Sequence, residues 1–189
     1  MKKYLLICAA ALVLSAGLSS CKDEEKKEDA VELTPDPTLY ERVGGSTLVN
    51  DPAASGQMIE QGYLTLRSVV DSSILVIAGD ADMQPFFEVL LTEVGAGNTT
   101  GFAALSKNLT DFFAFATGSE NHTYAGIDMD AAHDPSRNGR MGKLANNDDF
   151  TRFIGDVAVG LTQNGVSDQE LINDLVALIE TLRTTVVQA

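Results

Sequence analysis

Apolar side chains recur every three or four positions from residue 150 onward, which is the spacing of one face of an α-helix. The C-terminal set contains Leu171, Ile172, Leu175, Leu178, Ile179, Leu182 and Val186. Ser167 and Glu170 stand in front of it with the spacing of a capping box. A second set, after capping residues 146–149 and before a stop at Asn164-Gly165, contains Phe150, Phe153, Ile154, Val157 and Leu161. We predict two antiparallel helices, because few residues join them.

Two earlier segments have the same helical spacing. The first contains Phe102, Leu105, Leu109, Phe112, Phe113 and Ala116, and the second contains Ile59, Tyr63, Leu66, Val70, Ile74 and Ile77. We expect the first to begin at Thr99 or Thr100 and to stop at Gly118, and the second to end at Gly79. Residues 72–77 are rich enough in β-branched side chains for a strand, but no alternating segment could pair with them. The predicted class is therefore all-α, without an internal repeat.

The first 20 residues have the composition of a secretory signal peptide. A basic start precedes an apolar run at residues 5–17, which is too short to span a bilayer as a helix. The sequence that follows, Leu18-Ser19-Ser20-Cys21, resembles the lipobox of bacterial lipoproteins, in which the Cys is acylated and becomes the mature N-terminus. The alternative is an ordinary signal peptide followed by an unrelated Cys.

Residues 21–37 predict a charged, flexible tether between a lipid on Cys21 and a domain at residues 38–189. Residues 22–29 contain no apolar side chain, so they cannot bury surface. Their start, Lys22-Asp23-Glu24-Glu25, resembles an export signal of some Gram-negative lipoproteins. We therefore expect an outer-membrane lipoprotein that touches the membrane only through its lipid, and we leave open whether it is displayed at the cell surface.

Charge and motif content narrow the possible functions. The chain has 13 basic and 27 acidic side chains, a net charge of -14, which excludes a nucleic-acid partner bound through phosphates. Removal of Cys8 with the signal and acylation of Cys21 would leave no thiol for chemistry. No Gly-x-Ser-x-Gly motif for hydrolysis occurs in the sequence. Two histidines remain: His122 in a predicted surface loop, and His133 at the end of a predicted short helix at 128–133.

Several motifs resemble, in order, those of the group 1 truncated haemoglobins over nearly the whole predicted domain. They are Leu39-Tyr40-Glu41-Arg42-Val43-Gly44-Gly45, Val69-Val70-Asp71, Gly79-Asp80, Pro85-Phe86-Phe87, Phe112-Phe113, Gly118, Tyr124-Ala125-Gly126, Met129, His133 and Asn164-Gly165-Val166. The resemblance implies a two-over-two helical sandwich that binds haem b, with His133 as the proximal ligand of the iron. A neutral imidazole whose other ring N–H is hydrogen-bonded is a common ligand of haem iron.

The resemblance also implies which side chains line the haem pocket, although a four-helix domain would need apolar side chains for its core as well. They are Phe86, Phe87, Leu105, Leu109, Phe113, Met129 and Phe150. Ile74 stands where the family usually has a distal Tyr, or Ser73 does if the register shifts by one, and Leu105 and Leu109 stand where it often has Gln. Tyr63 lies about 16 Å from Ile74 along the helix, too far to substitute.

These replacements lead us to expect an apolar distal side that retains oxygen weakly, because a hydrogen bond to bound oxygen contributes about 1–3 kcal/mol. Binding of CO and NO should be less affected. Three functions compete: binding of a diatomic gas, which we favour; nitric-oxide dioxygenation, the enzymatic option, which the apolar distal side disfavours; and a haem-free or haem-sequestering lipoprotein that acts as a binding module.

Three segments depart from the compact pattern of the family, near residues 46–57, 93–97 and 135–143. The last follows His133 directly and contains three cations, Arg137, Arg140 and Lys143. These cations either meet the haem propionates or belong to a solvated loop.

Overall fold

The computed structural model describes residues 35–189, of which Asp36–Ala189 form one compact unit. The predicted signal peptide, the predicted lipidation site Cys21 and nearly all of the predicted tether lie outside the described residues.

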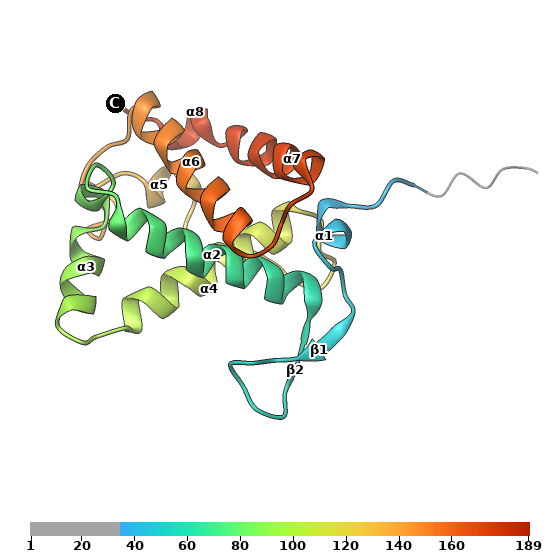
Figure 1. Cartoon of the computed structure of the whole chain (residues 1–189). Coiled ribbons are helices and arrows are strands. Elements are labelled where there is room, and N and C mark those ends of the chain that lie inside the picture. Colours follow the sequence, from blue (N-terminus) through green and yellow to red (C-terminus); the bar gives the residue numbers. More distant parts are fainter. Residues whose placement is uncertain (1–34) are drawn as a thin grey trace, which may run out of the picture. The chain divides into compact units, whose positions relative to one another are not determined.

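Four long helices make up most of this unit: α2 (Gln61–Gly79), α4 (Thr100–Ala116), α6 (Asn147–Gln163) and α7 (Gln169–Glu180). Figure 1 shows α6 and α7 lying over the crossed pair of α2 and α4. The shorter elements are α1 (Leu39–Arg42), the 3₁₀ helix η1 (Gln84–Phe86), α3 (Glu88–Gly95), α5 (Met129–Ala132) and α8 (Arg183–Val186). The predicted all-α class is confirmed, and residues 72–77 belong to a helix rather than a strand.

A β-hairpin precedes α2 and overlaps the segment at 46–57 that was expected to be an insertion. Its strands are β1 (Leu48–Asn50) and β2 (Met58–Glu60), paired antiparallel with Val49 opposite Ile59. The prediction that Ile59 belongs to the helix is therefore wrong, since α2 begins at Gln61. Three-residue strands are too short for their alternation to be told from helical spacing, and the apolar Ile59 happens to fall in register with the stripe of α2.

The helix termini follow local capping chemistry. Asn146 caps α6, within the expected capping residues, and forms a capping box with Asp149. The predicted Ser167–Glu170 box is wrong: Asp168 caps α7, and its Oδ1 accepts hydrogen bonds from the N–H groups of Glu170 and Leu171. The C-terminal stripe also spans two helices, because α7 ends at Glu180 and α8 begins at Arg183. Asp and Ser are comparable N-caps, so the sequence alone did not distinguish Ser167 from its neighbour Asp168 as the cap.

The core surrounds α2, which packs against α4 and α6. Its buried side chains include Leu66, Val69, Ile74 and Ile77. At the crossing with α6, Gly160 approaches Ser73 so closely that a Cβ atom on Gly160 would collide with the Ser73 hydroxyl. By length and hydropathy α2 could cross a membrane, but its burial between neighbouring helices is that of a core helix.

Candidate functional site

His133 is presented by the short helix α5, which it follows directly. Its Nδ1 lies 2.8 Å from the carbonyl oxygen of Met129, one turn earlier. Burial lowers the pKa of His133 below its ordinary value, against the opposing effect of the bond to Met129. The imidazole is therefore neutral at pH 7, with Nδ1–H donating to the carbonyl and the lone pair of Nε2 left for another partner.

Three adjoining cavities form a slot through the domain. The volumes of the mouth, middle and inner cavities are about 510 Å³, 90 Å³ and 40 Å³. The mouth and middle cavities share Phe86, Phe87, Leu109, Phe112, Met129, His133 and Met141. The middle and inner cavities share Leu109, Phe113, Phe153 and Ile179. The three cavities therefore adjoin one another along shared side chains, and we call them together the slot.

All nine predicted site residues lie on the walls of this slot. Four of them line both the mouth and the middle cavity: Phe86, Phe87, Met129 and His133. Leu105 lines the mouth, Phe150 the middle and Ile74 the inner cavity, while Phe113 lines the middle and inner cavities and Leu109 lines all three. The structure thus brings together the residues that the sequence nominated from five separate segments, and their contact with haem stays a prediction.

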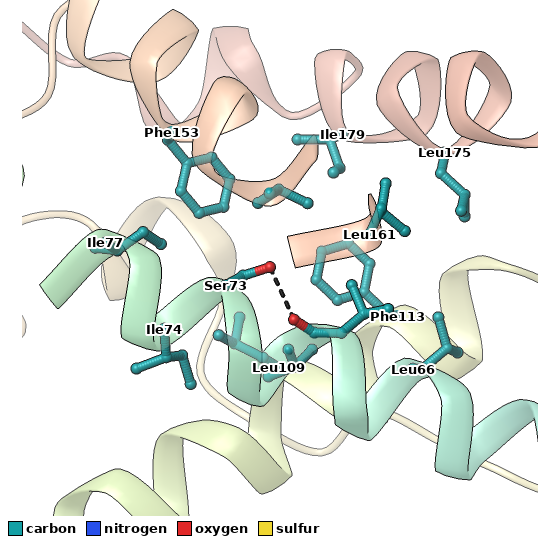
Figure 2. A pocket seen from close by; sticks show the side chains of 13 residues that line it. Leu66, Ser73, Ile74, Ile77, Leu109, Phe113, Phe153, Leu161, Leu175 and Ile179 are labelled. Carbon is teal, nitrogen blue, oxygen red and sulfur yellow. Dashed lines mark hydrogen bonds between the residues drawn. The ribbon is translucent and has the colours of Figure 1, made fainter. Parts of the chain in front are cut away.

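The inner cavity is almost entirely apolar. Figure 2 shows side chains of α2, α4, α6 and α7 converging on it, among them Ile74, Leu109, Phe153 and Ile179. Ser73 is the one polar side chain among the residues that line it. The Ser73 hydroxyl donates to the carbonyl of Val69, at 2.8 Å, so its proton is already engaged. This wall therefore offers no free hydrogen-bond donor.

Helix α4 buries a different face from the one its apolar stripe suggests. The side chains that it buries are small, Ser106, Thr110 and Ala114, and the Ser106 hydroxyl donates to Asp71 of α2 at 2.5 Å. The apolar residues Leu105, Leu109, Phe112 and Phe113 are only partly buried and line the slot. Large apolar and aromatic side chains on a cavity wall are typical of a ligand pocket.

The three cations after His133 all have carboxylate partners. Arg137 pairs with Asp130 at 2.6 Å, and Lys143 pairs with Asp149 at 3.3 Å while its ammonium lies 4.4 Å from the centre of the Phe86 ring. Arg140 makes two hydrogen bonds to Glu93 and alone of the three lines the slot. Its guanidinium holds the pKa of Glu93 below the usual range.

His122 lies in a polar cluster rather than on the surface as expected. Its ring stacks on Tyr63 with centroids 4.4 Å apart, and its Nδ1 is 2.9 Å from the Ser119 hydroxyl. The Tyr63 hydroxyl donates to Asp111 at 2.7 Å, and burial raises the pKa of Tyr63. Neither ring is among the residues that line the slot, in agreement with the expectation that Tyr63 cannot replace a distal Tyr.

Several wall residues were not nominated from the sequence. Met83 and Met141 come from irregular segments that have no periodic signal. Ile179, Leu182 and Val186 belong to the predicted C-terminal stripe, which serves as core and wall at once. For these three the signal existed, but a stripe does not show which of its members border a cavity.

The chain matches no protein-family model and no curated protein. Among solved structures it is similar to three crystal structures of truncated hemoglobin from Tetrahymena pyriformis, each a different single-substitution variant in the Fe(III) form. Each is 24% identical, aligns with a TM-score of 0.56, and covers 81% of this chain and 100% of its own. The fold is therefore that of a truncated globin, as the sequence motifs predicted.

Proposed function

We propose that the domain is a group 1 truncated haemoglobin that binds haem b in the slot and a diatomic gas at the iron. The observation that carries the proposal is His133, whose neutral ring borders two cavities and whose Nδ1 is held by the Met129 carbonyl. That bond leaves Nε2 as the metal-binding nitrogen, which is the usual arrangement of a metal-bound histidine. The likeness to a truncated hemoglobin in its Fe(III) form supports the same assignment.

The residues of the slot fit a porphyrin. A flat apolar ring needs a wide apolar cleft, and Phe86, Phe87, Leu109 and Met129 provide one that begins beside His133. Haem iron would supply the centre at which oxygen, CO or NO binds. The walls would exclude water from it, and the inner wall around Ile74 offers bound oxygen no free donor. Oxygen should therefore be released quickly, while CO and NO depend less on such a bond.

The proposed location is the outer membrane, with the lipid on Cys21 as the sole attachment. This part rests on the lipobox-like sequence before Cys21 and on the charged segment after it. The acidic composition is compatible with this location, because the lipid would attach the protein while the net negative charge keeps the domain off an anionic membrane surface.

The test is an absorption spectrum of the mature chain, residues 21–189 with Cys21→Ser, titrated with haem. We expect an intense Soret band that is lost or strongly shifted in His133→Ala and returns when imidazole is added. His122→Gln is the matched control, since His122 lies outside the slot. No Soret band in the unsubstituted chain, or an unchanged band in His133→Ala, would refute the proposal.

A haem-sequestering lipoprotein is the second candidate, and the mouth cavity favours it. This cavity is the largest of the three, opens to solvent and has partly exposed apolar walls, a shape suited to an exchangeable ligand. Transfer of haem to apomyoglobin separates the two functions. A gas-binding haemoglobin should retain haem for hours and bind CO reversibly, whereas a carrier should release haem within minutes.

A further inference from the structure

An ion pair crosses the mouth of the slot. Arg140, in the segment after His133, donates from Nη1 and Nη2 to the two carboxylate oxygens of Glu93 on α3, at 2.9 and 2.6 Å. Both residues line the mouth cavity. Such a fork-to-fork pair presents the guanidinium in the geometry that recognises a carboxylate. A cationic, carboxylate-binding group therefore stands at the opening of an apolar cavity.

The local sequence leaves room for this pair. Gly101 lies in the first turn of α4, and a Cβ atom there would collide with both the Glu93 carboxylate and the Arg140 guanidinium. The side chain of Arg140 is 49% exposed and that of Glu93 is 26% exposed. A pair so accessible to water contributes little to folding, so Arg140 can exchange its partner at small cost.

The other two cations of the segment are placed differently. Arg137 pairs with Asp130, which precedes His133 in the chain, and Arg137 does not line the slot. Lys143 lies over the Phe86 ring beside Asp149, and it too is absent from the residues that border the mouth. The sequence left open whether these cations meet the haem propionates or belong to a solvated loop. Of the three, only Arg140 lies where it could contact a ligand in the slot.

We propose that Arg140 is the carboxylate-binding residue of the slot, and that Glu93 occupies it until an apolar ligand bearing an acidic group displaces the Glu93 carboxylate. The ligand class is a flat apolar molecule with a carboxylate at one edge, buried by its ring and recognised at the mouth by its acid. This inference rests on the proposed haem-binding function and adds to it a competition between two carboxylates for one guanidinium. Glu93 thus sets the affinity without touching the ring.

The experiment compares haem with its dimethyl ester, in which both carboxylates are neutral, by titration of the mature chain. Arg140→Gln should weaken binding of haem about 3- to 10-fold and leave the ester unchanged. Glu93→Gln should strengthen binding of haem by a similar factor, because it frees Arg140, and again leave the ester unchanged. Arg137→Gln is the matched control on the same segment and should alter neither affinity.

The opposite signs expected for Arg140→Gln and Glu93→Gln separate a binding effect from damage to the fold, which would weaken binding in both variants. The inference is overturned if Arg140→Gln changes haem and ester equally or changes neither, or if Glu93→Gln weakens haem binding. Failure of the proposed function has a different signature: the unsubstituted chain would then bind neither porphyrin.

Discussion

Leu109 offers the sharpest test of whether the apolar face of α4 serves a ligand or the core. Its side chain lines all three cavities and is only partly buried. Leu→Ala in a close-packed core costs about 2–5 kcal/mol of unfolding free energy. At Leu109 much of the side chain faces open space and has few packing partners to lose, so we expect about 1 kcal/mol for Leu109→Ala in the haem-free protein.

Haem should increase the loss of unfolding free energy caused by Leu109→Ala. A ring packed against Leu109 supplies the missing contacts, so Leu109→Ala should cost about 1–2 kcal/mol more when haem is bound. Leu171→Ala is the matched control: Leu171 is 7% exposed on α7 and borders none of the three cavities. Its cost should be about 2–5 kcal/mol with or without haem. Urea unfolding of both variants, with and without one equivalent of haem, gives all four values.

The reasoning fails if Leu109→Ala costs as much as Leu171→Ala in the haem-free protein, or if haem leaves its cost unchanged. The first result would make Leu109 an ordinary core residue. The second would mean that haem does not pack against the apolar face of α4.

Two further predictions concern α6. Gly160→Ala should destabilise the domain by about 1–2 kcal/mol in urea unfolding, because its Cβ would collide with Ser73, whereas Gly155→Ala, with open space around it, should stabilise the helix by up to about 1 kcal/mol. Equal effects at the two glycines would contradict the close crossing. Burial and the nearby Asp80 carboxylate raise the pKa of Asp156, whose Oδ2 is buried without a partner. Asp156→Asn should therefore raise the free energy of unfolding by about 1 kcal/mol at pH 7. This gain should disappear on acidification, because Asp156 of the unsubstituted protein then takes up a proton and loses its charge. A gain that does not depend on pH would refute this explanation.

How far the sequence predicts this fold differs from element to element. The stripes of α4 and α6 place both helices to within a few residues, because long amphipathic periods and caps such as Asn146 are strong local signals. The hairpin at 48–60 escapes prediction because its strands have three residues each. The break at Thr181 escapes as well, since the apolar stripe continues through it.

The candidate site shows a different limit. Periodicity finds the apolar face of α4 but cannot say whether that face meets the core or a cavity, because both need the same residue types. The distinction is visible only in three dimensions, where Ser106, Thr110 and Ala114 fill the tight contact on the other face. Small residues at helical spacing beside a stripe of Leu and Phe are therefore the signal that could have identified a cavity wall.

The two histidines show why residue type alone does not assign chemistry. His122 uses its Nδ1 toward Ser119, with the Glu60 carboxylate 3.7 Å away, and its ring is stacked on Tyr63, so the cluster holds it as a structural element. His133 uses Nδ1 toward a backbone carbonyl, and burial lowers its pKa, so its ring is neutral at pH 7. A carbonyl fixes the ring without adding charge, which keeps Nε2 basic enough to bind a metal and free to face the slot. If the proposed function holds, the backbone bond one turn earlier, rather than the presence of a histidine, is what would fit position 133 to bind the iron.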